Sequence, residues 1–436
     1  MYVAMFAAFI LSIAWRPSVG VYLLVVSLPL QTVRYRLHIY PLGGQYLDIL
    51  VLGSVLGLII RRQPINPKSE ISKILIAFTV FCYFSLWQGI FFIHTSLPLF
   101  IDDPRFSDWK NYVEMFFIAF LVASAIKKKS QIQFLVLLMC LSVLLVNKSY
   151  SSGISGVDVS HFSEDIRAPG PLGYAGVNGF AAFESMFASF LLGLYVYEKR
   201  LFVKIGLLGL IATCSYCLLY SFSRGGYAGL LVGVLTIGLL KARHFLIIVL
   251  ALLIGWQVLL PVSVQERITM TTAGESAGQK FDSSSEERLA LWEDAINMTI
   301  QNPLTGTGFD TYQYMQRVGP YTDTHNYYLK VLAETGIIGF SFYLFLLARL
   351  FSIGMTLFRG STDPFWASLS LGFLAAITSA IVLNFFGDRW TYQQVDGYLW
   401  VLLGCVMRGV MTMQEERIAL NSSPELLCTG NAEALA

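Results

Sequence analysis

The sequence predicts an all-α fold, a polytopic bundle of about 12 transmembrane helices with one large loop on its outer side. The first observation is composition: apolar residues make up 55% of the 436 residues, charged residues only 13%, and the mean hydropathy is +0.61. Soluble globular proteins do not have this composition. The second is that the apolar residues gather in runs close to the roughly 20 residues that one bilayer crossing needs. The third is the sorting of charged residues between the connections.

The apolar runs define one membrane domain over residues 1–412, which includes the outward loop 262–326. The first two runs are short and are interrupted by Arg16-Pro17, so we expect 12 helices, with one more or one fewer. The runs are residues 2–15, 18–33, 46–60, 71–94, 109–126, 131–147, 176–197, 203–222, 225–240, 245–261, 327–349, 365–386 and 395–412. We expect the polar tail, 413–436, to be cytoplasmic and disordered.

The charged residues give the orientation. Basic residues fall on alternate connections, and the positive-inside rule makes that face cytoplasmic; they are Arg16, Arg61, Arg62, Lys68, Lys127, Lys128, Lys129, Lys199, Arg200, Lys204, Lys241, Arg243, Arg349 and Arg359. Acidic residues such as Asp102, Glu164, Glu287 and Asp388 fall on the opposite face. The net charge of +2 hides this asymmetry and gives no reason to expect a nucleic-acid partner.

The largest outward segment, 262–326, is polar over 269–285 and then reads as a helix from residue 286. Four apolar side chains recur near one face of that helix, which is typical of a helix that lies on the membrane surface or packs against the bundle; they are Leu289, Trp292, Ile296 and Ile300. Asn302-Pro303 should end the helix, and Gly306 and Gly308 predict a tight turn.

Three arginines on the outward side are candidates for binding an anionic ligand, because a planar guanidinium can hold phosphate oxygens in a bidentate way. Each has an alternative interpretation. Arg224 can be an anchor at the membrane interface, although Gly225 and Gly226 leave space beside it. Arg288 can pair with neighbouring glutamates on a solvated face. Arg167 can be a solvated charge in its Pro- and Gly-rich loop.

His325 stands at the entrance to the helix 327–349. A histidine there is often structural, but an imidazole can also take a proton from a hydroxyl group near neutral pH. Asn326 can orient the imidazole or bind a substrate hydroxyl. Glu334 lies about 13 Å further along the helix, where an ionisable group is costly unless it is paired, so it is either buried against an arginine or part of the site.

The sequence lacks the motifs of several enzyme classes, which argues against an ATPase, a dehydrogenase or a serine hydrolase. It has no phosphate-binding P-loop, no GxGxxG, no zinc-ligand spacing and no GxSxG. Two adjacent acids, Asp102 and Asp103, do not by themselves define a metal site. We expect neither a cofactor nor a metal.

The order and spacing of the outward motifs resemble the O-antigen ligase and O-antigen polymerase superfamily over roughly residues 165–350. The signature residues are Arg288 and Trp292; Asn302-Pro303-Leu304, Gly306 and Gly308-Phe309; Thr324-His325-Asn326, Leu329, Leu332-Ala333-Glu334 and Gly336. Ser223-Arg224-Gly225-Gly226 resembles a second element of the family. Arg167, Gly170-Pro171 and Asn178-Gly179-Phe180-Ala181 resemble a third. The family's Asn-Pro-Asn is here Gly176-Val177-Asn178, so only its last asparagine is retained.

The resemblance implies a bundle of the membrane glycosyltransferase type in the bacterial inner membrane, with its active site facing the periplasm and a role in lipopolysaccharide or other polysaccharide biosynthesis. Its donor is a glycan linked to undecaprenyl pyrophosphate, and its acceptor is a glycan, a lipid A core or a protein. Carried over by position, His325, Arg288 and Arg224 are catalytic. Arg167, Asn178, Asn326, Glu334 and Trp292 are expected to bind substrate.

Three functions stay open. A ligase passes a finished glycan to its acceptor, and the single large outward loop favours this function. A polymerase joins lipid-linked repeat units. A polysaccharide flippase or other transporter would also have about 12 helices, but transporters usually place charges at the membrane midplane and often show internal repeats.

Overall fold

The structure, a computed structural model, describes residues 1–270 and 283–421, and in these ranges every regular element is a helix. The predicted all-α class is therefore confirmed. Eight helices of the described part are long and apolar enough to cross a membrane, or nine if α12 and α13, which meet at 105°, form one span. Three shorter apolar helices, α1, α2 and α11, have 10–17 residues. The count of 12 spans remains a prediction.

The helices follow the chain in the order α1 (Tyr2–Ala14), α2 (Ser18–Ser27), α3 (Gln31–Tyr35), η1 (Arg36–Ile39), η2 (Gly43–Gln45), α4 (Tyr46–Ile60), α5 (Glu70–Gln88), α6 (Ile90–Ile93), α7 (Pro104–Ala125), α8 (Lys129–Gly153), η3 (Glu164–Ile166), η4 (Gly173–Ala175), α9 (Gly176–Tyr197), α10 (Leu201–Tyr220), α11 (Arg224–Leu240), α12 (His244–Leu259), α13 (Val262–Thr269), α14 (Ser283–Gln301), α15 (Tyr312–Met315), α16 (Tyr327–Gly360), α17 (Pro364–Leu383) and α18 (Gln393–Asn421).

Helices α9, α11 and α17 form the centre of the part of the bundle that carries the site. Small residues let their backbones approach, as a Cβ on Gly193 of α9 would lie 2.3 Å from the Gly372 nitrogen of α17. Hydroxyl pairs add polar contacts, with Ser185 and Ser379 Oγ atoms 3.0 Å apart. Close packing of these three helices fixes the beginnings of α9 and α11 at the same end of the bundle.

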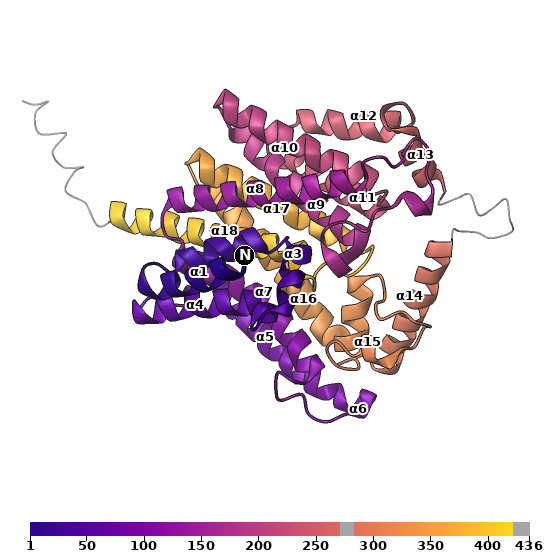
Figure 1. Ribbon diagram of the computed structural model, residues 1–436, viewed down its shortest axis with the longest axis horizontal. Helices are drawn as coiled ribbons and strands as arrows, with labels where there is room; N and C mark the ends of the chain where they lie inside the picture. The colour runs from indigo at the N-terminus through magenta and orange to yellow at the C-terminus, as the bar shows by residue number, and fades with distance from the viewer. Residues whose placement is uncertain (271–282, 422–436) are drawn as a thin grey trace, which may run out of the picture.

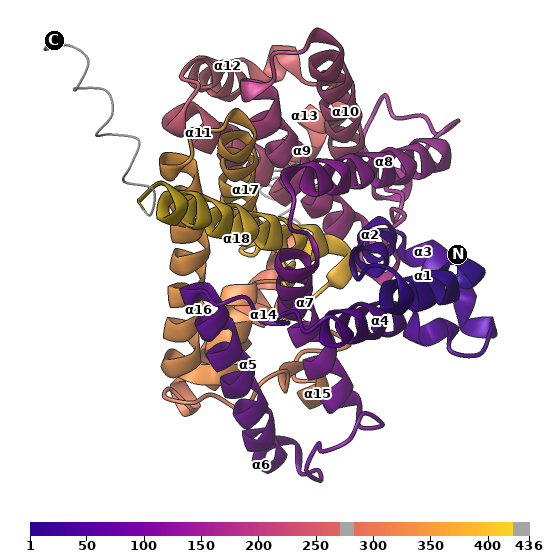
Figure 2. The ribbon, with the colours of Figure 1, turned by 90° about the vertical axis from the view of Figure 1, so that its left-hand side faces the viewer.

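Helix α18 crosses the middle of the bundle, with α7, α16 and α17 packed around it (Figure 2). Its last turns project from the left-hand end in Figure 1. The expected boundary at residue 412 falls inside α18, so residues 413–421 are helical; they are rich in good helix formers, and Glu415 pairs with Arg408 at 2.8 Å. Residues 422–436 lie outside the described residues.

The segment expected as the large outward loop contains α13, α14 and α15, which gather at the right-hand end of the bundle in Figure 1. Residues 271–282 of that loop lie outside the described residues. Helix α14 ends at Gln301, where Asn302-Pro303 predicted an end. Gly306 and Gly308 have φ values of 66° and 111°, so the predicted tight turn is confirmed.

The face of α14 that packs against the protein is formed by Leu291, Ala295 and Met298, which contact Tyr312 and Ala333. Three of the four residues predicted to lie on the membrane surface or to pack against the bundle are exposed, so they do not pack against the bundle, and the membrane-surface alternative stays a prediction; Leu289, Ile296 and Ile300 are exposed by 47%, 46% and 69%. The segment after the Gly306 turn folds back to cover the Leu291 side, a contact that helical periodicity alone does not reveal.

Candidate active site

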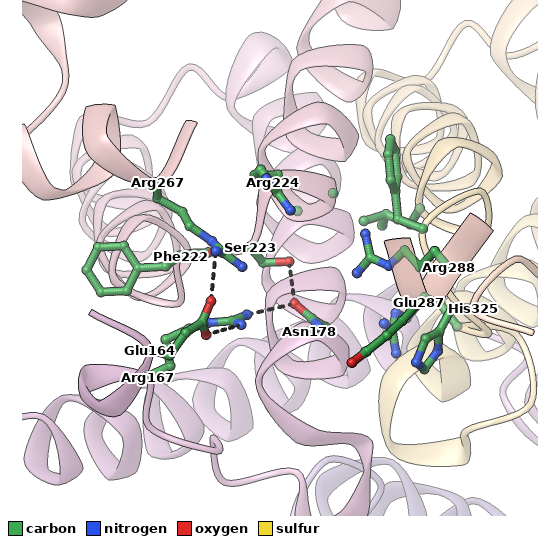
Figure 3. Close-up of a pocket in the computed structure, with 15 residues that line it drawn as sticks. Glu164, Arg167, Asn178, Phe222, Ser223, Arg224, Arg267, Glu287, Arg288 and His325 are labelled. Carbon is green, nitrogen blue, oxygen red and sulfur yellow. Dashed lines mark hydrogen bonds and ion pairs between the residues drawn. The ribbon is translucent and has the colours of Figure 1, made fainter. Parts of the chain in front are cut away.

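A polar pocket of about 260 Å³ lies where α9, α11, α13, α14 and the segment before α16 meet. Figure 3 shows its side chains approaching from several sides. The lining includes five of the eight residues predicted for the site, namely Arg167, Asn178, Arg224, Arg288 and His325. Segments separated by up to 158 positions, from Arg167 to His325, thus meet in one place.

The pocket has an excess of positive charge. Five arginines and two glutamates line it, a formal excess of three positive charges with His325 neutral. Helices α9 and α11 begin at the pocket. The N-terminus of a helix carries partial positive charge and free N–H groups, which favour bound anions.

One wall is an ion-pair cluster centred on Glu164 (Figure 3). Its carboxylate accepts from Arg167 Nη1 at 3.2 Å and from Arg267 Nη1 at 2.8 Å. Both guanidinium groups are largely buried, with side-chain exposures of 14% and 7%. A buried cation is costly without a partner, so Glu164 provides the negative charge that this wall needs.

Asn178 connects that wall to the start of α11. Its Oδ1 accepts from Arg167 Nη2 at 3.0 Å and from Ser223 Oγ at 2.9 Å. Asn178 is the one asparagine that remains from the Asn-Pro-Asn pattern described above. These two hydrogen bonds hold its side chain in the pocket lining.

Arg224 enters the pocket from the first residue of α11, after a turn in which Phe222 has a positive φ of 53°. The glycines that follow it serve close packing: a Cβ on Gly225 would lie 2.8 Å from Phe386 Cβ, and one on Gly226 would lie 2.7 Å from Leu218 Cδ1. Both glycines also line the pocket. The sequence predicted the space beside Arg224, and the structure shows that protein side chains occupy much of it.

Arg288 and Glu287 reach the pocket from α14 on the side opposite Arg267 (Figure 3). Their position depends on the contact of Leu291 and Ala295 with the Tyr312 and Ala333 cluster. The apolar face of α14 therefore sets where the Arg288 guanidinium lies.

His325 is held in an unusual backbone conformation, with a φ of 53°. Left-handed backbone at a residue other than glycine is strained and is common at functional sites. On one side Thr324 Oγ1 donates to Asn326 O at 2.7 Å, and on the other Asn326 Oδ1 accepts from Tyr328 N and Leu329 N, capping α16. These contacts fix the turn that presents the imidazole.

The imidazole is paired with Asp323. His325 Nδ1 lies 3.2 Å from Asp323 Oδ2. Burial raises the pKa of Asp323, but the hydrogen bond to His325 and the charges of Lys330, His325 and Arg389 outweigh it, so the net pKa is lowered. With Nδ1 directed at this carboxylate, Nε2 is left for a ligand in the pocket.

Sequence reasoning missed two pocket arginines, Arg267 and Arg389. Arg389 follows α17, its backbone N–H donates to Asn384 Oδ1 at 3.0 Å, and burial lowers the pKa of its guanidinium. Arg267 lies on α13, with its guanidinium 4.7 Å from the centre of the Phe162 ring. A signal existed, since both stand in connections predicted to be outward, but neither belongs to a recognisable motif.

Three predicted site residues are not among those that line the pocket. Asn326 caps α16, and Trp292 packs beside the Leu291 cluster. Glu334 accepts from the backbone N–H groups of Asp310 at 2.9 Å and Tyr312 at 3.0 Å. Glu334 is therefore buried against backbone donors, and its expected arginine partner is not seen among the described residues.

A buried ion-pair network joins α16 to two segments beside it, which carry Asp310 and Asp388. Lys330 Nζ donates to Asp310 Oδ1 at 3.2 Å and to Asp388 Oδ2 at 3.3 Å. Burial raises the pKa of Asp310 to about 6. Asp388 also accepts from the backbone of Trp390 and Thr391. The network ties the Asp310 turn, α16 and the connection that carries Arg389 into one frame.

Comparison with known proteins gives one family match. Residues 208–344 match a family model described as O-Antigen ligase, and no curated protein matches the chain. The matched segment contains Arg224, Arg288 and His325, whereas Arg167, Asn178 and Arg389 lie outside it. The resemblance predicted from the motifs is confirmed over this part of the chain. Residues 208–344 of this helical protein, which has multiple candidate membrane spans, are thus similar to the O-antigen ligase family.

Proposed function

We propose that the protein is a glycan transferase that moves a glycan from undecaprenyl pyrophosphate to an acceptor hydroxyl at the periplasmic face of the bacterial inner membrane, in the manner of a ligase. The observation that carries the proposal is the convergence of Arg167, Arg224, Arg288 and His325 on one pocket with an excess of positive charge. A diphosphate between a lipid and a sugar carries one negative charge on each phosphate, so it suits this pocket.

In the proposed reaction the acceptor hydroxyl attacks the anomeric carbon of the donor sugar. A bond forms between the hydroxyl oxygen and that carbon, and the bond from the carbon to the diphosphate oxygen breaks. Undecaprenyl pyrophosphate leaves with the bonding electrons. His325 takes the hydroxyl proton on Nε2, while Asp323 holds the other side of the ring.

Charge stabilisation is the main task of the protein, because the diphosphate is already a good leaving group. The arginines and the starts of α9 and α11 neutralise the charge that develops on it. The proposal requires no nucleotide and no metal.

The proposed acceptor is a lipid A core, another glycan or a protein. We also propose that the chain crosses the membrane about 12 times, as hydropathy suggests.

The test is reconstitution in vesicles with a lipid-linked donor and candidate acceptors. His325→Ala and Arg288→Ala are compared with the parent and with Arg317→Ala, a control on the same side of the protein whose guanidinium pairs with Asp294 and does not line the pocket. We expect both pocket variants to lose transfer by about 100-fold or more, and the control to keep it. Transfer at the parental rate by both would disprove the site.

The products separate the alternatives. Transfer of whole glycans to a separate acceptor supports the ligase, and growth of lipid-linked chains from single repeat units supports the polymerase. Movement of lipid-linked glycan across the vesicle with no new glycosidic bond would make the protein a transporter.

A further inference from the structure

A second and larger cavity lies at the other end of α10 from the arginine pocket. It is a groove of about 1100 Å³ between α8, α10 and the beginning of α17. The arginine pocket is lined by Phe222, just after the end of α10, whereas the groove is lined by Lys199 and Arg200, just before its start. The 20 residues of α10 place the Lys199 and Arg200 end of the groove about 30 Å from the arginine pocket.

The groove follows from the way α8 and α10 pack. Their polar contacts join the halves nearer the arginine pocket: Tyr150 Oη donates to Tyr220 O at 2.8 Å, and the Asn147 side chain lies 3.1 Å from Thr213 Oγ1. The groove occupies the space between the other halves, from Lys129 and Arg200 to Leu144 and Thr213.

The wall of the groove is apolar and partly bare. Leu137, Leu141 and Leu144 of α8 face it and are exposed by 52%, 49% and 42%. On α10, a Cβ added to Gly206 or Gly209 would meet no atom within 4 Å. These glycines therefore do not serve helix packing, and they leave the groove open. The groove is about 20 Å long from Arg200 to Thr213. This length is comparable to half the thickness of a bilayer core, which is roughly 30 Å thick in total.

The mouth of the groove carries both signs of charge with a cationic excess. Lys129, Lys199 and Arg200 face two carboxylates. Arg200 is paired with Glu198, with Nη2 3.0 Å from Oε2, and Lys129 is paired with Asp363. Lys127 and Lys128, both exposed, precede Lys129. A negatively charged headgroup would balance this excess, and basic pockets between membrane helices are known to bind anionic lipids.

We propose that this groove binds one anionic glycerophospholipid, with an acyl chain between α8 and α10 and its phosphate at Lys199, Arg200 and Lys129. The two charged ends lie at opposite ends of α10, so the phosphate that we place at Lys199, Arg200 and Lys129 is not the diphosphate of a donor bound in the arginine pocket. By the positive-inside rule the lipid comes from the cytoplasmic leaflet. The proposal does not depend on the function proposed above.

The experiment uses the full-length protein in detergent, with phosphatidylglycerol and phosphatidylcholine as the probes. Native mass spectrometry counts retained lipid, and the unfolding temperature is measured with each lipid added. We expect phosphatidylglycerol to be retained and to raise the unfolding temperature by about 2 °C or more, because a ligand that binds only the folded state stabilises it. Phosphatidylcholine should do neither.

Two variants locate the effect. Lys199→Ala/Arg200→Ala removes charge at the mouth, and its control, Lys68→Ala/Lys73→Ala, removes two exposed lysines that do not line the groove. Gly206→Leu/Gly209→Leu fills the groove from its open side. Both groove variants should lose most of the phosphatidylglycerol effect, and the control should keep it. The proposal is overturned if phosphatidylcholine stabilises equally, or if the charge variant still binds phosphatidylglycerol as the parent does.

Discussion

The Glu164 carboxylate and the Arg267 guanidinium form a direct ion pair, with Oε1 2.8 Å from Nη1, inside the arginine pocket. The same carboxylate reaches Arg167 at 3.2 Å. Glu164 thus places a negative charge on two of the cations that we propose for the diphosphate. A bound donor must share these arginines with Glu164 or displace it.

Glu164→Gln should therefore lower the KM for the lipid-linked donor with little change in kcat. The Glu164 side chain is 62% exposed, so the effect is that of a solvent-screened pair, about 1 kcal/mol or less, which corresponds to about 5-fold at most. Steady-state kinetics in vesicles measure it. A higher KM would mean instead that Glu164 holds Arg167 and Arg267 in place for the donor.

Arg389→Ala should lower kcat/KM by about 10- to 100-fold, the range expected for one charged hydrogen bond. Burial lowers the pKa of this guanidinium, and an anionic ligand would favour its charged form. Arg389→Lys should recover only part of the loss, because an ammonium lacks the planar fork. Unfolding temperatures of the variants, with Arg317→Ala as control, separate this loss from misfolding. Parental kinetics in Arg389→Ala would remove it from the site.

Much of the architecture and five of the residues that line the pocket could be predicted, because the patterns that indicate them lie within short stretches of the sequence. Apolar runs give the helices, and Asn302-Pro303 gives the end of α14. Arg224, Arg288 and His325 stand in motifs with fixed spacing. Each of these patterns depends on neighbours in the sequence, so no knowledge of the tertiary packing is needed.

The rest depends on packing between distant segments. Arg389 reaches the pocket because Lys330 and Asp388 hold its connection against α16, and Arg267 of α13 because it pairs with Glu164 of η3. The buried face of α14 is set by Tyr312, which a turn brings back over it. Glu334 looks like a site residue in the sequence, yet it is buried beneath that turn.

Glu334→Ala should destabilise the protein more than it impairs the remaining folded enzyme. The carboxylate accepts from Asp310 N and Tyr312 N, and its removal leaves two buried N–H groups without that acceptor, at about 1–3 kcal/mol each. Glu334→Gln keeps one acceptor oxygen and should lie between. Thermal unfolding and activity per folded molecule are measured together. An inactive Glu334→Gln protein of parental stability would return Glu334 to the chemistry.

Transfer should continue in excess chelator at the parental rate, because the proposed reaction relies on arginines for charge stabilisation. Pre-incubation with EDTA, followed by the vesicle assay in metal-free buffer, tests this. Added Mg²⁺ or Mn²⁺ serves as the control. Loss of transfer in EDTA with recovery on adding one of these ions would show that a metal shares the neutralisation of the diphosphate.

Asp323→Asn should lower kcat per folded molecule. The pKa of Asp323 is lowered from its ordinary value, and its Oδ2 lies 3.2 Å from His325 Nδ1. The negative charge of this carboxylate stabilises the positive charge that forms on the ring as it takes the acceptor proton. Steady-state kinetics in vesicles and thermal unfolding of the variant measure the loss.

The fall in kcat per folded molecule distinguishes this role from packing. The neutral amide of the Asp323→Asn variant could orient the ring but not stabilise the charge that forms on it. A variant that only loosened the turn around His325 would lose thermal stability together with activity. A lowered unfolding temperature with the parental kcat per folded molecule would therefore assign Asp323 to the fold of the turn and leave His325 without its proposed partner.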